Sequence, residues 1–317
     1  MPLGSFFKYV EIQTKLASII PFIIGTLYSL YRYKSFNLKN FIIMGISLVA
    51  FDMATTAINN YIDYKKALKV EGCNYKDENA IVKYGIKEST AKSIIFTLLT
   101  LAIVFGILLT LSTNVIVLLI GIVSFLAGIL YTYGPVPISR MPLGEVFSGV
   151  FMGFVILFLS CYIHIFDNNI ISLMYNSNML NISINLLEVF YIFLISIPTM
   201  NGIANIMLAN NICDVEDDIL NSRFTLPYYL GKKNSLNLYE ILYYIGYIDI
   251  IILVVLKILP IMSLLVILTI IPLNKNIKLF CQKPVKNETF VFAVKNFAIM
   301  NVTHILALLI VILFNKQ

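Results

Sequence analysis

Long apolar stretches recur along this chain and alternate with polar connections. Most of them are close to the length of about 20 residues that a helix needs to cross a bilayer. The pattern therefore predicts an all-α membrane protein with nine transmembrane helices, of which only the eighth is short. The predicted spans are 16–31, 41–62, 93–111, 115–133, 144–165, 187–211, 238–257, 259–273 and 292–314.

The polar connections carry fewer structural signals. Residues 64–92 are too long for a structureless loop, so a short helix is expected at 79–84, ending at Gly85, with a further helix start near Ser89. Residues 166–186 are rich in Asn and contain no Lys or Arg. We expect them to form a spacer without chemistry of their own.

Composition and charge support the membrane assignment. The chain is 59% hydrophobic and 13% charged, which is too little charge to cover a soluble globule of 317 residues. The polar start of the chain resembles neither a signal peptide nor a transit peptide, so the first span is expected to remain in the mature protein. The net charge of +6 suits an anionic lipid leaflet and gives no reason to expect nucleic-acid binding.

The distribution of cations predicts an orientation. With a cytoplasmic N-terminus, the opposite side keeps few of the 23 Lys and Arg residues: only Arg32, Lys34, Lys39, Lys257 and Lys316. This bias follows the positive-inside rule and predicts a multi-pass protein of the cell membrane. The longer connections at 64–92, 134–143 and 213–237 would then cap a single transmembrane domain, 1–317, on its cytoplasmic side.

A first polar motif, Asn59-Asn60-Tyr61-Ile62-Asp63, ends the second apolar run. Asn59 and Asp63 are four residues apart, so their side chains share one face of a helix. Ionisable groups inside a membrane are costly and usually face a cavity or a partner, which favours a functional reading of this motif. Asp52, two to three turns earlier, is expected to pair helices.

A second and stronger motif, Asn210-Asn211-Ile212-Cys213-Asp214-Val215-Glu216-Asp217-Asp218, ends the sixth apolar run. Its Asn210, Asp214 and Asp218 follow each other at four-residue steps, with Asp217 beside them, so three oxygen-bearing side chains share one helix face. Acids at this density repel each other unless a cation is present. Both motifs fall on the predicted cytoplasmic side.

Carboxylate and amide oxygens are hard ligands that fit Mg²⁺ or Mn²⁺, and the four Cys have no paired spacing for Zn²⁺. Magnesium is usually held by one or two carboxylates together with substrate phosphates. A phosphorylated substrate with a lipid tail, such as an allylic diphosphate, fits this site at a membrane edge. Two metal ions could neutralise the leaving diphosphate, while the π faces of Tyr131 or Tyr133 stabilise the allylic cation.

A turn on the same predicted side supplies further polar groups. It reads Tyr131-Thr132-Tyr133-Gly134-Pro135-Val136-Pro137, and it is followed by Arg140 and by Leu143-Gly144-Glu145. Glycine and proline force the turn. A turn alone would not need the tyrosine, arginine and glutamate side chains that accompany it.

The chain resembles the UbiA superfamily of intramembrane prenyltransferases, and within it the 1,4-dihydroxy-2-naphthoate polyprenyltransferases of menaquinone synthesis. The resemblance rests on the two polar motifs and the turn, together with Thr225-Leu226 and Leu230-Gly231 after the second motif. It implies a nine-helix bundle around a central cavity. It also implies Mg²⁺-dependent transfer of a polyprenyl group from its diphosphate to an aromatic acceptor, with loss of the carboxylate of that acceptor.

The motifs and the resemblance together give a set of candidate site residues. The candidate catalytic residues are Asp63, Asp214 and Asp218. The candidate metal ligands are Asn59, Asp63, Asp214, Asp217 and Asp218. The candidate substrate contacts are Asn60, Lys66, Tyr131, Arg140, Asn210 and Arg223.

The chain departs from the family pattern at a few positions. Asn60 stands where the pattern has Asp, a further acid is replaced within 67–69, and Phe224 follows Arg223 in place of a basic pair. Three other readings stay open: another aromatic or lipid acceptor, an ion-coupled transporter, with which a helical bundle with an internal repeat is also compatible, and an inactive relative that assists another enzyme, which the departures support.

Overall fold

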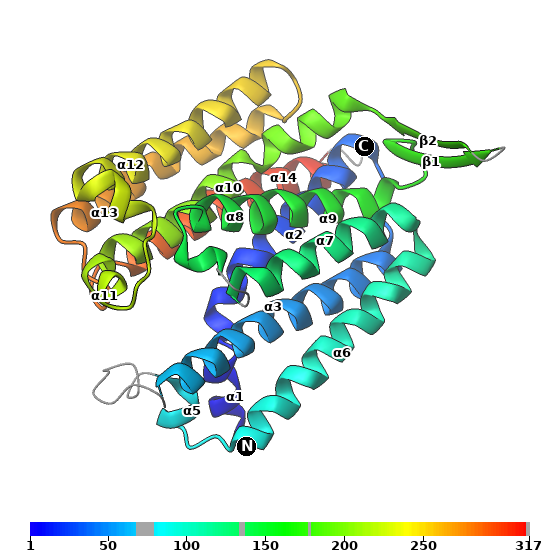
Figure 1. Ribbon diagram of the computed structural model, residues 1–317. Coiled ribbons are helices and arrows are strands. Elements are labelled where there is room, and N and C mark those ends of the chain that lie inside the picture. The colour runs from blue at the N-terminus through cyan, green and yellow to red at the C-terminus, as the bar shows by residue number, and fades with distance from the viewer. Residues whose placement is uncertain (68–78, 133–136, 177–178, 315–317) are drawn as a thin grey trace. The chain divides into compact units, whose positions relative to one another are not determined.

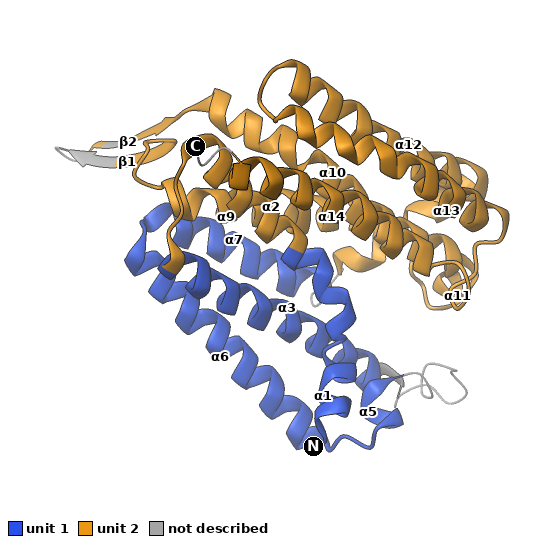
Figure 2. Ribbon diagram, turned by 180° about the vertical axis from the view of Figure 1, so that it is seen from behind, with its two compact units in different colours: residues 1–19, 39–132 blue, residues 20–38, 133–317 orange. Residues whose placement is uncertain are grey.

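The computed structural model describes residues 1–67, 79–132, 137–176 and 179–314 (Figure 1). Within these ranges the regular structure is helical apart from one β-hairpin. The chain divides into two compact units. Unit 1 comprises residues 1–19 and 39–132, and unit 2 comprises residues 20–38 and 133–317 (Figure 2). The single domain expected over 1–317 and its central cavity stay predictions.

Unit 1 is built on three long helices and a short N-terminal segment. Its elements are α1 (Leu3–Tyr9), η1 (Ile12–Lys15), α3 (Leu38–Ala67), α5 (Ala80–Lys83), α6 (Glu88–Ser112) and α7 (Val115–Thr132). Figure 2 shows α3, α6 and α7 running side by side within this unit. Apolar side chains from α1, α3, α5 and α6 form one buried cluster at the end of the unit that carries the N-terminus: Tyr9, Val10, Ala54, Ala57, Ala80, Ile81, Ile86, Ala91 and Leu98.

Unit 2 is arranged around helix α10 (Leu186–Cys213), which packs against α12, α14, α8 and η3. The other elements are α2 (Leu16–Tyr33, whose first turn belongs to unit 1), η2 (Ile138–Arg140), α8 (Gly144–Ser148), the π-helical η3 (Gly149–Val155), α9 (Ile156–Ile165), β1 (Ile171–Asn176), β2 (Met179–Ile184), α11 (Val215–Leu220), α12 (Leu226–Val255), η4 (Ile261–Thr269), α13 (Ile270–Gln282) and α14 (Val291–Phe314).

Two asparagines fix α10 to α12. Asn201 Nδ2 donates to the carbonyl of Leu242 at 3.0 Å, and Asn205 Nδ2 donates to the carbonyl of Tyr239 at 2.9 Å. Such bonds between helices stabilise membrane bundles by about 1 kcal/mol each. On the other side of α10, Gly153 lets η3 approach closely, because a Cβ atom there would lie 2.6 Å from the Cα of Met200. The helix that carries the second motif is therefore held from both sides.

The predicted number of spans was wrong by one. Among the described residues, eight helices are long and apolar enough to cross a membrane: Ile12–Tyr33, Leu38–Lys65, Glu88–Ser112, Gly144–Ile165, Leu186–Cys213, Leu226–Val255, Ile261–Gln282 and Val291–Phe314. The fourth predicted span corresponds to Val115–Tyr131, which is apolar but shorter than these. The eighth predicted span is not short, because η4 continues into α13 and the combined helix has 22 residues.

The polar connections are more ordered than the sequence suggested. The spacer at 166–186 contains an antiparallel hairpin in which Ile171 lies opposite Ile184, and the Oγ atoms of Ser172 and Ser183 are 2.7 Å apart. Polar and apolar residues alternate along 180–184, which is the period of a strand. The expected cap at 213–237 is mostly helical, because it contains α11 and the first turns of α12.

The short helix expected at 79–84 is confirmed as α5. The Asn79 side chain caps its start by accepting a hydrogen bond from Ile81 N at 2.9 Å. Its end is closed by Gly85, whose φ of +58° is a backbone conformation that glycine adopts without strain. Helix α6 then begins at Glu88, next to the expected start near Ser89.

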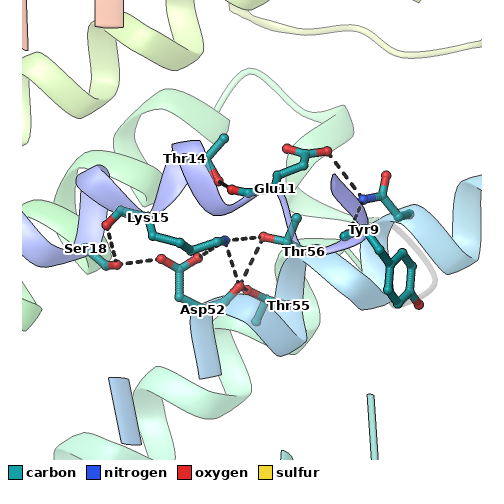
Figure 3. A network of polar contacts seen from close by, with 9 residues as sticks. Tyr9, Glu11, Thr14, Lys15, Ser18, Asp52, Thr55 and Thr56 are labelled. Atoms are coloured by element: carbon teal, nitrogen blue, oxygen red, sulfur yellow. Dashed lines mark hydrogen bonds and ion pairs between the residues drawn. The ribbon is translucent and has the colours of Figure 1, made fainter. Parts of the chain in front are cut away.

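A buried ion pair docks the N-terminal segment on α3 (Figure 3). The Lys15 side chain is only 2% exposed, and its ammonium donates to Asp52 Oδ1 at 2.7 Å, to the carbonyl of Asp52 at 3.1 Å and to Thr56 Oγ1 at 2.7 Å. Ser18 Oγ donates to the second carboxylate oxygen, Asp52 Oδ2, at 2.5 Å. The expectation that Asp52 pairs helices is therefore confirmed.

The first polar motif takes part in the same docking. Asn60 Nδ2 donates to the carbonyl of Tyr9 at 2.8 Å and to Glu11 Oε1 at 3.4 Å. The hydroxyl of Tyr9 in turn donates to the carbonyl of Ala57 at 3.0 Å. An aspartate at position 60 could not donate these bonds, because an ionised carboxylate is only an acceptor. The departure at Asn60 thus has a structural reason.

We expect Lys15→Met to lower the free energy of unfolding by about 3 to 5 kcal/mol, because it leaves the Asp52 carboxylate buried without its cation. Equilibrium unfolding in detergent micelles measures this change. The double variant Lys15→Met with Asp52→Leu should recover much of the loss, whereas Lys283→Met, at an exposed ion pair, should cost less than about 1 kcal/mol. A double variant as unstable as the single one would contradict this account of the docking.

We expect Asn60→Asp to release the N-terminal segment, because the variant removes the donor to Tyr9 and places a second carboxylate beside Glu11. Amide hydrogen exchange of residues 1–15 should become faster by at least about tenfold, as a loss of about 1.4 kcal/mol implies. Asn59→Asp makes the same chemical change one position earlier and serves as the control. Equal exchange in the two variants would show that Asn60 does not hold this segment.

Candidate active site

The second polar motif lies where α10 ends and α11 begins. Asp214 is the residue between the two helices, with φ −103° and ψ 6°. The backbone pattern nevertheless continues, because Asp214 N donates to the carbonyl of Asn210 at 3.1 Å and Asp218 N donates to the carbonyl of Asp214 at 2.8 Å. The predicted four-residue steps are therefore retained across the junction.

Burial separates the acids of this motif. The residues Asp214 and Asp218 are 9% and 2% exposed, whereas Glu216 and Asp217 are exposed. The structure thus sets Asp214 and Asp218 apart as a buried pair. Asn210 is half-buried one turn earlier, and its backbone carbonyl is engaged by Asp214. Asp217 as a metal ligand stays a prediction, and its exposure does not favour it.

Asp218 is held by the turn that follows α11. Arg223 Nε lies 3.3 Å from Asp218 Oδ1 in an ion pair, and Thr225 Oγ1 donates to Asp218 Oδ2 at 3.4 Å. The pKa of Asp218 is raised above its ordinary value, first because the carboxyl is buried and then because the Asp214 charge is close. The Arg223 guanidinium, the Thr225 bond and the charge of Lys286 oppose this rise in pKa.

Asp214 has a partner that the sequence did not indicate. Lys286, in the connection between α13 and α14, donates from Nζ to Asp214 Oδ2 and forms an ion pair with it. The two residues are 72 positions apart. In the sequence, Lys286 is one of several lysines in a polar connector, so nothing distinguished it from its neighbours.

The segment that follows the Gly-Pro turn contacts the residues directly after α11. Arg223 donates from its terminal guanidinium nitrogen to the carbonyl of Ser139 at 3.3 Å, and Phe224 N donates to the carbonyl of Arg140 at 3.1 Å. The residues directly after the Gly-Pro turn therefore lie beside the segment that carries the Asp218 partner Arg223, within unit 2. Arg140 itself is half-buried, and contact of its side chain with a substrate stays a prediction.

A further buried acid lies on this side of α10. Glu145 is 3% exposed, and its Oε1 atom accepts a hydrogen bond from Asn211 Nδ2 at 2.8 Å. Its second oxygen, Oε2, has no hydrogen-bond partner among the described residues. From the sequence, Glu145 was predicted only as a polar side chain next to the turn, and Asn211 was given no role. Neither residue belongs to the four-residue steps that single out the other candidates.

The first polar motif belongs to unit 1. Asn59 and Asp63 are half-buried on α3, and Asp63 takes part in a polar interaction. Asn60 is turned to the N-terminal segment, and Tyr131 is half-buried at the end of α7. The side chain of Lys66 lies outside the described residues. Because the two motifs belong to different units, their joint action on one substrate stays a prediction.

The buried acids of unit 2 fit Mg²⁺ better than a metal that needs a closed protein cage. Among the described residues, no group of three or more His, Cys, Asp or Glu side chains gathers in a way that would hold a metal ion alone. Magnesium does not require such a group, because waters and substrate phosphates complete its octahedron. Asp214 and Asp218, with the amide oxygen of Asn210, supply the hard donors that it prefers.

Known proteins resemble the chain in sequence and in fold. It is 32% identical over 226 residues to the 1,4-dihydroxy-2-naphthoate octaprenyltransferase of Bacillus subtilis (strain 168), over 71% of this chain and 66% of that protein. Its fold resembles the apo structure of a UbiA homologue from Aeropyrum pernix K1, with a TM-score of 0.66 at 19% identity over 93% of this chain and 98% of that one.

A UbiA homologue from Archaeoglobus fulgidus, solved with bound GPP and Mg²⁺, has a similar fold. Its TM-score is 0.61 at 13% identity, over 97% of this chain and 99% of that one. The model of the UbiA prenyltransferase family matches residues 18–310, which is nearly the whole chain. This protein, with its eight candidate spans among the described residues and its buried acids at the end of α10, therefore belongs to the UbiA prenyltransferase family of membrane transferases.

Proposed function

We propose that this protein transfers a polyprenyl group from polyprenyl diphosphate to an aromatic acceptor in a Mg²⁺-dependent reaction, and that the acceptor is 1,4-dihydroxy-2-naphthoate. The observation that carries the proposal is the buried pair Asp214 and Asp218, in which each carboxylate faces a cation from another segment. Membership of a transferase family removes the reading as an ion-coupled transporter.

The buried acids have a direct role in such a reaction. Asp214 and Asp218 would hold Mg²⁺, and Asn210 would supply an amide oxygen. When bound, the metal would neutralise the negative charge of the diphosphate as the carbon–oxygen bond to the prenyl group breaks. Arg223 and Thr225 orient the Asp218 carboxylate. Because both acids are largely out of water, their interaction with a cation is stronger than it would be at an open surface.

Other candidate residues are proposed to contact the diphosphate, the allylic cation and a second metal ion. Arg140 and Lys66 would contact the diphosphate, and Tyr131 would stabilise the allylic cation through its π face. Asn59 and Asp63 would bind a second metal ion, with Asp63 as the one carboxylate of the first motif. Asn60, predicted as a substrate contact, is engaged with Tyr9 and Glu11, so we no longer propose it for that role.

The identity of the acceptor rests on sequence similarity. The relative from Bacillus subtilis is named for 1,4-dihydroxy-2-naphthoate and an octaprenyl donor, and the match covers just under two thirds of its length. Similarity at 32% identity favours the same acceptor and, with it, a place in menaquinone synthesis. Another aromatic or lipid acceptor would use the same diphosphate site. We also propose that this site faces the cytoplasm at the cell membrane, as the positive-inside bias predicts.

We expect Asp214→Ala and Asp218→Ala each to lower prenyl transfer by at least about 100-fold, because each removes a ligand that neutralises charge in the transition state. Transfer of a labelled polyprenyl group in membranes measures this loss. Glu216→Gln, at an exposed acid of α11 that has no proposed role, should keep full activity. All variants should elute from gel filtration like the unaltered protein. Full activity in either alanine variant would contradict the assignment of the metal site.

We expect a chelator to stop turnover and Mg²⁺ or Mn²⁺ to restore it, because oxygen donors prefer these ions. The assay supplies labelled polyprenyl diphosphate with 1,4-dihydroxy-2-naphthoate, with other aromatic acceptors and with membrane lipids in parallel, and mass spectrometry identifies the product. The proposal predicts a decarboxylated, prenylated naphthalene-diol. A product on another acceptor alone would replace the naphthoate, and no turnover with any acceptor would indicate an inactive relative.

A further inference from the structure

Lys286, which the family motifs do not include, forms an ion pair with one of the two buried acids. The Lys286 ammonium pairs with Asp214, whose side chain is 11% exposed, whereas the lysine side chain is 47% exposed. A half-exposed cation therefore neutralises a largely buried carboxylate. The matching cation on Asp218 is Arg223, from the turn directly after α11, so the two acids are neutralised by different segments of the chain.

The backbone around Lys286 is held in place, so that the side chain is the part that can move. Lys283 Nζ lies 2.7 Å from Glu288 Oε2 across this turn. Thr289 Oγ1 donates to the carbonyl of Lys283 at 2.6 Å and accepts from Val285 N at 2.9 Å. These contacts close the turn on both sides of Lys286. Its flexible four-carbon stem then gives the ammonium a limited range around Asp214.

A metal ion and the ammonium would compete for the same carboxylate. Both are cations, and like charges a few ångströms apart in a partly buried site repel strongly. A divalent ion bound to Asp214 would therefore displace Lys286. The displaced ammonium would stay within reach of the metal site, where the strongest anion is the diphosphate. Lysine is well suited to that exchange, because its three donors rotate freely and bind phosphate oxygens as a point charge.

We propose that Lys286 is the resident counter-ion of Asp214 before substrate binds and that it transfers to the diphosphate when the metal–diphosphate enters. This proposal rests on the proposed function of the site. In the free protein the ammonium balances the Asp214 charge. In the loaded protein the metal takes over that task, and the ammonium neutralises a diphosphate oxygen. When no metal is bound, Lys286 thus neutralises the buried Asp214 carboxylate. When the diphosphate is bound, Lys286 adds a further cation to the site that holds it.

If Lys286 moves between Asp214 and the diphosphate, the variant Lys286→Gln should change the affinities for the metal and for the diphosphate in opposite directions. Binding of Mn²⁺ alone to the purified full chain should become about 3- to 10-fold tighter, because the competing cation is gone. Binding of inorganic pyrophosphate at saturating Mg²⁺ should become about 10-fold weaker, because a charged donor is lost. Electron paramagnetic resonance of Mn²⁺ and isothermal titration calorimetry measure these two affinities in detergent micelles. Lys286→Arg keeps the charge and should remain close to the unaltered protein in both.

Two further variants test whether the effect is specific to the pair of Lys286 and Asp214. Lys278→Gln removes an exposed charge from α13, outside this turn, so it should leave both affinities unchanged. In an Asp214→Asn background, Lys286→Gln should no longer tighten Mn²⁺ binding. If Lys286→Gln weakens Mn²⁺ binding, or leaves pyrophosphate binding unchanged, the exchange is wrong and Lys286 is only a structural partner of Asp214. If the unaltered protein binds neither Mn²⁺ nor Mg²⁺-pyrophosphate, the proposed function itself fails.

Discussion

The cost of burying carboxylates is the constraint on which this site depends. A charged carboxylate that is taken out of water without a partner costs several kcal/mol, so a cation brought to it by the fold favours its ionised form. The structure meets this condition three times with cations from different segments: Lys15 at Asp52, Arg223 at Asp218 and Lys286 at Asp214. The Lys15 cation is only 2% exposed, whereas Arg223 and Lys286 are 23% and 47% exposed and pair with acids at the junction of α10 and α11.

Much of the site could be predicted from local sequence. The four-residue steps from Asn210 to Asp218 depend only on helical periodicity, and the structure retains them because the backbone bonds continue across Asp214. The helix ending at Gly85 was equally local, since an Asn cap and a glycine with positive φ mark its ends. The membrane character followed from apolar run lengths, although run length alone overestimated the helix at Val115–Tyr131.

Long-range pairing was not visible in the sequence. Lys286 lies 72 residues from Asp214, and Glu145 lies 66 residues from Asn211, so no local spacing connects them. The role predicted for Asn60 failed for a related reason. Its place in the motif suggested a substrate contact, and no local spacing showed that its side chain bonds to Tyr9, 51 residues earlier. Which acid of a dense cluster is buried also depends on packing, and this is why Asp217 and Asp218 differ in exposure although they are adjacent in sequence.

The central claim is that Asp214 and Asp218 hold the metal that binds the diphosphate. A structure of the full chain with Mn²⁺ and an unreactive prenyl thiodiphosphate, in which anomalous scattering locates the manganese, tests it most directly. The account predicts an anomalous peak within about 2.0 to 2.4 Å of a carboxylate oxygen of Asp214 or Asp218, with Lys286 moved from Asp214 to a diphosphate oxygen. Manganese bound elsewhere, with Lys286 still paired to Asp214, would contradict it.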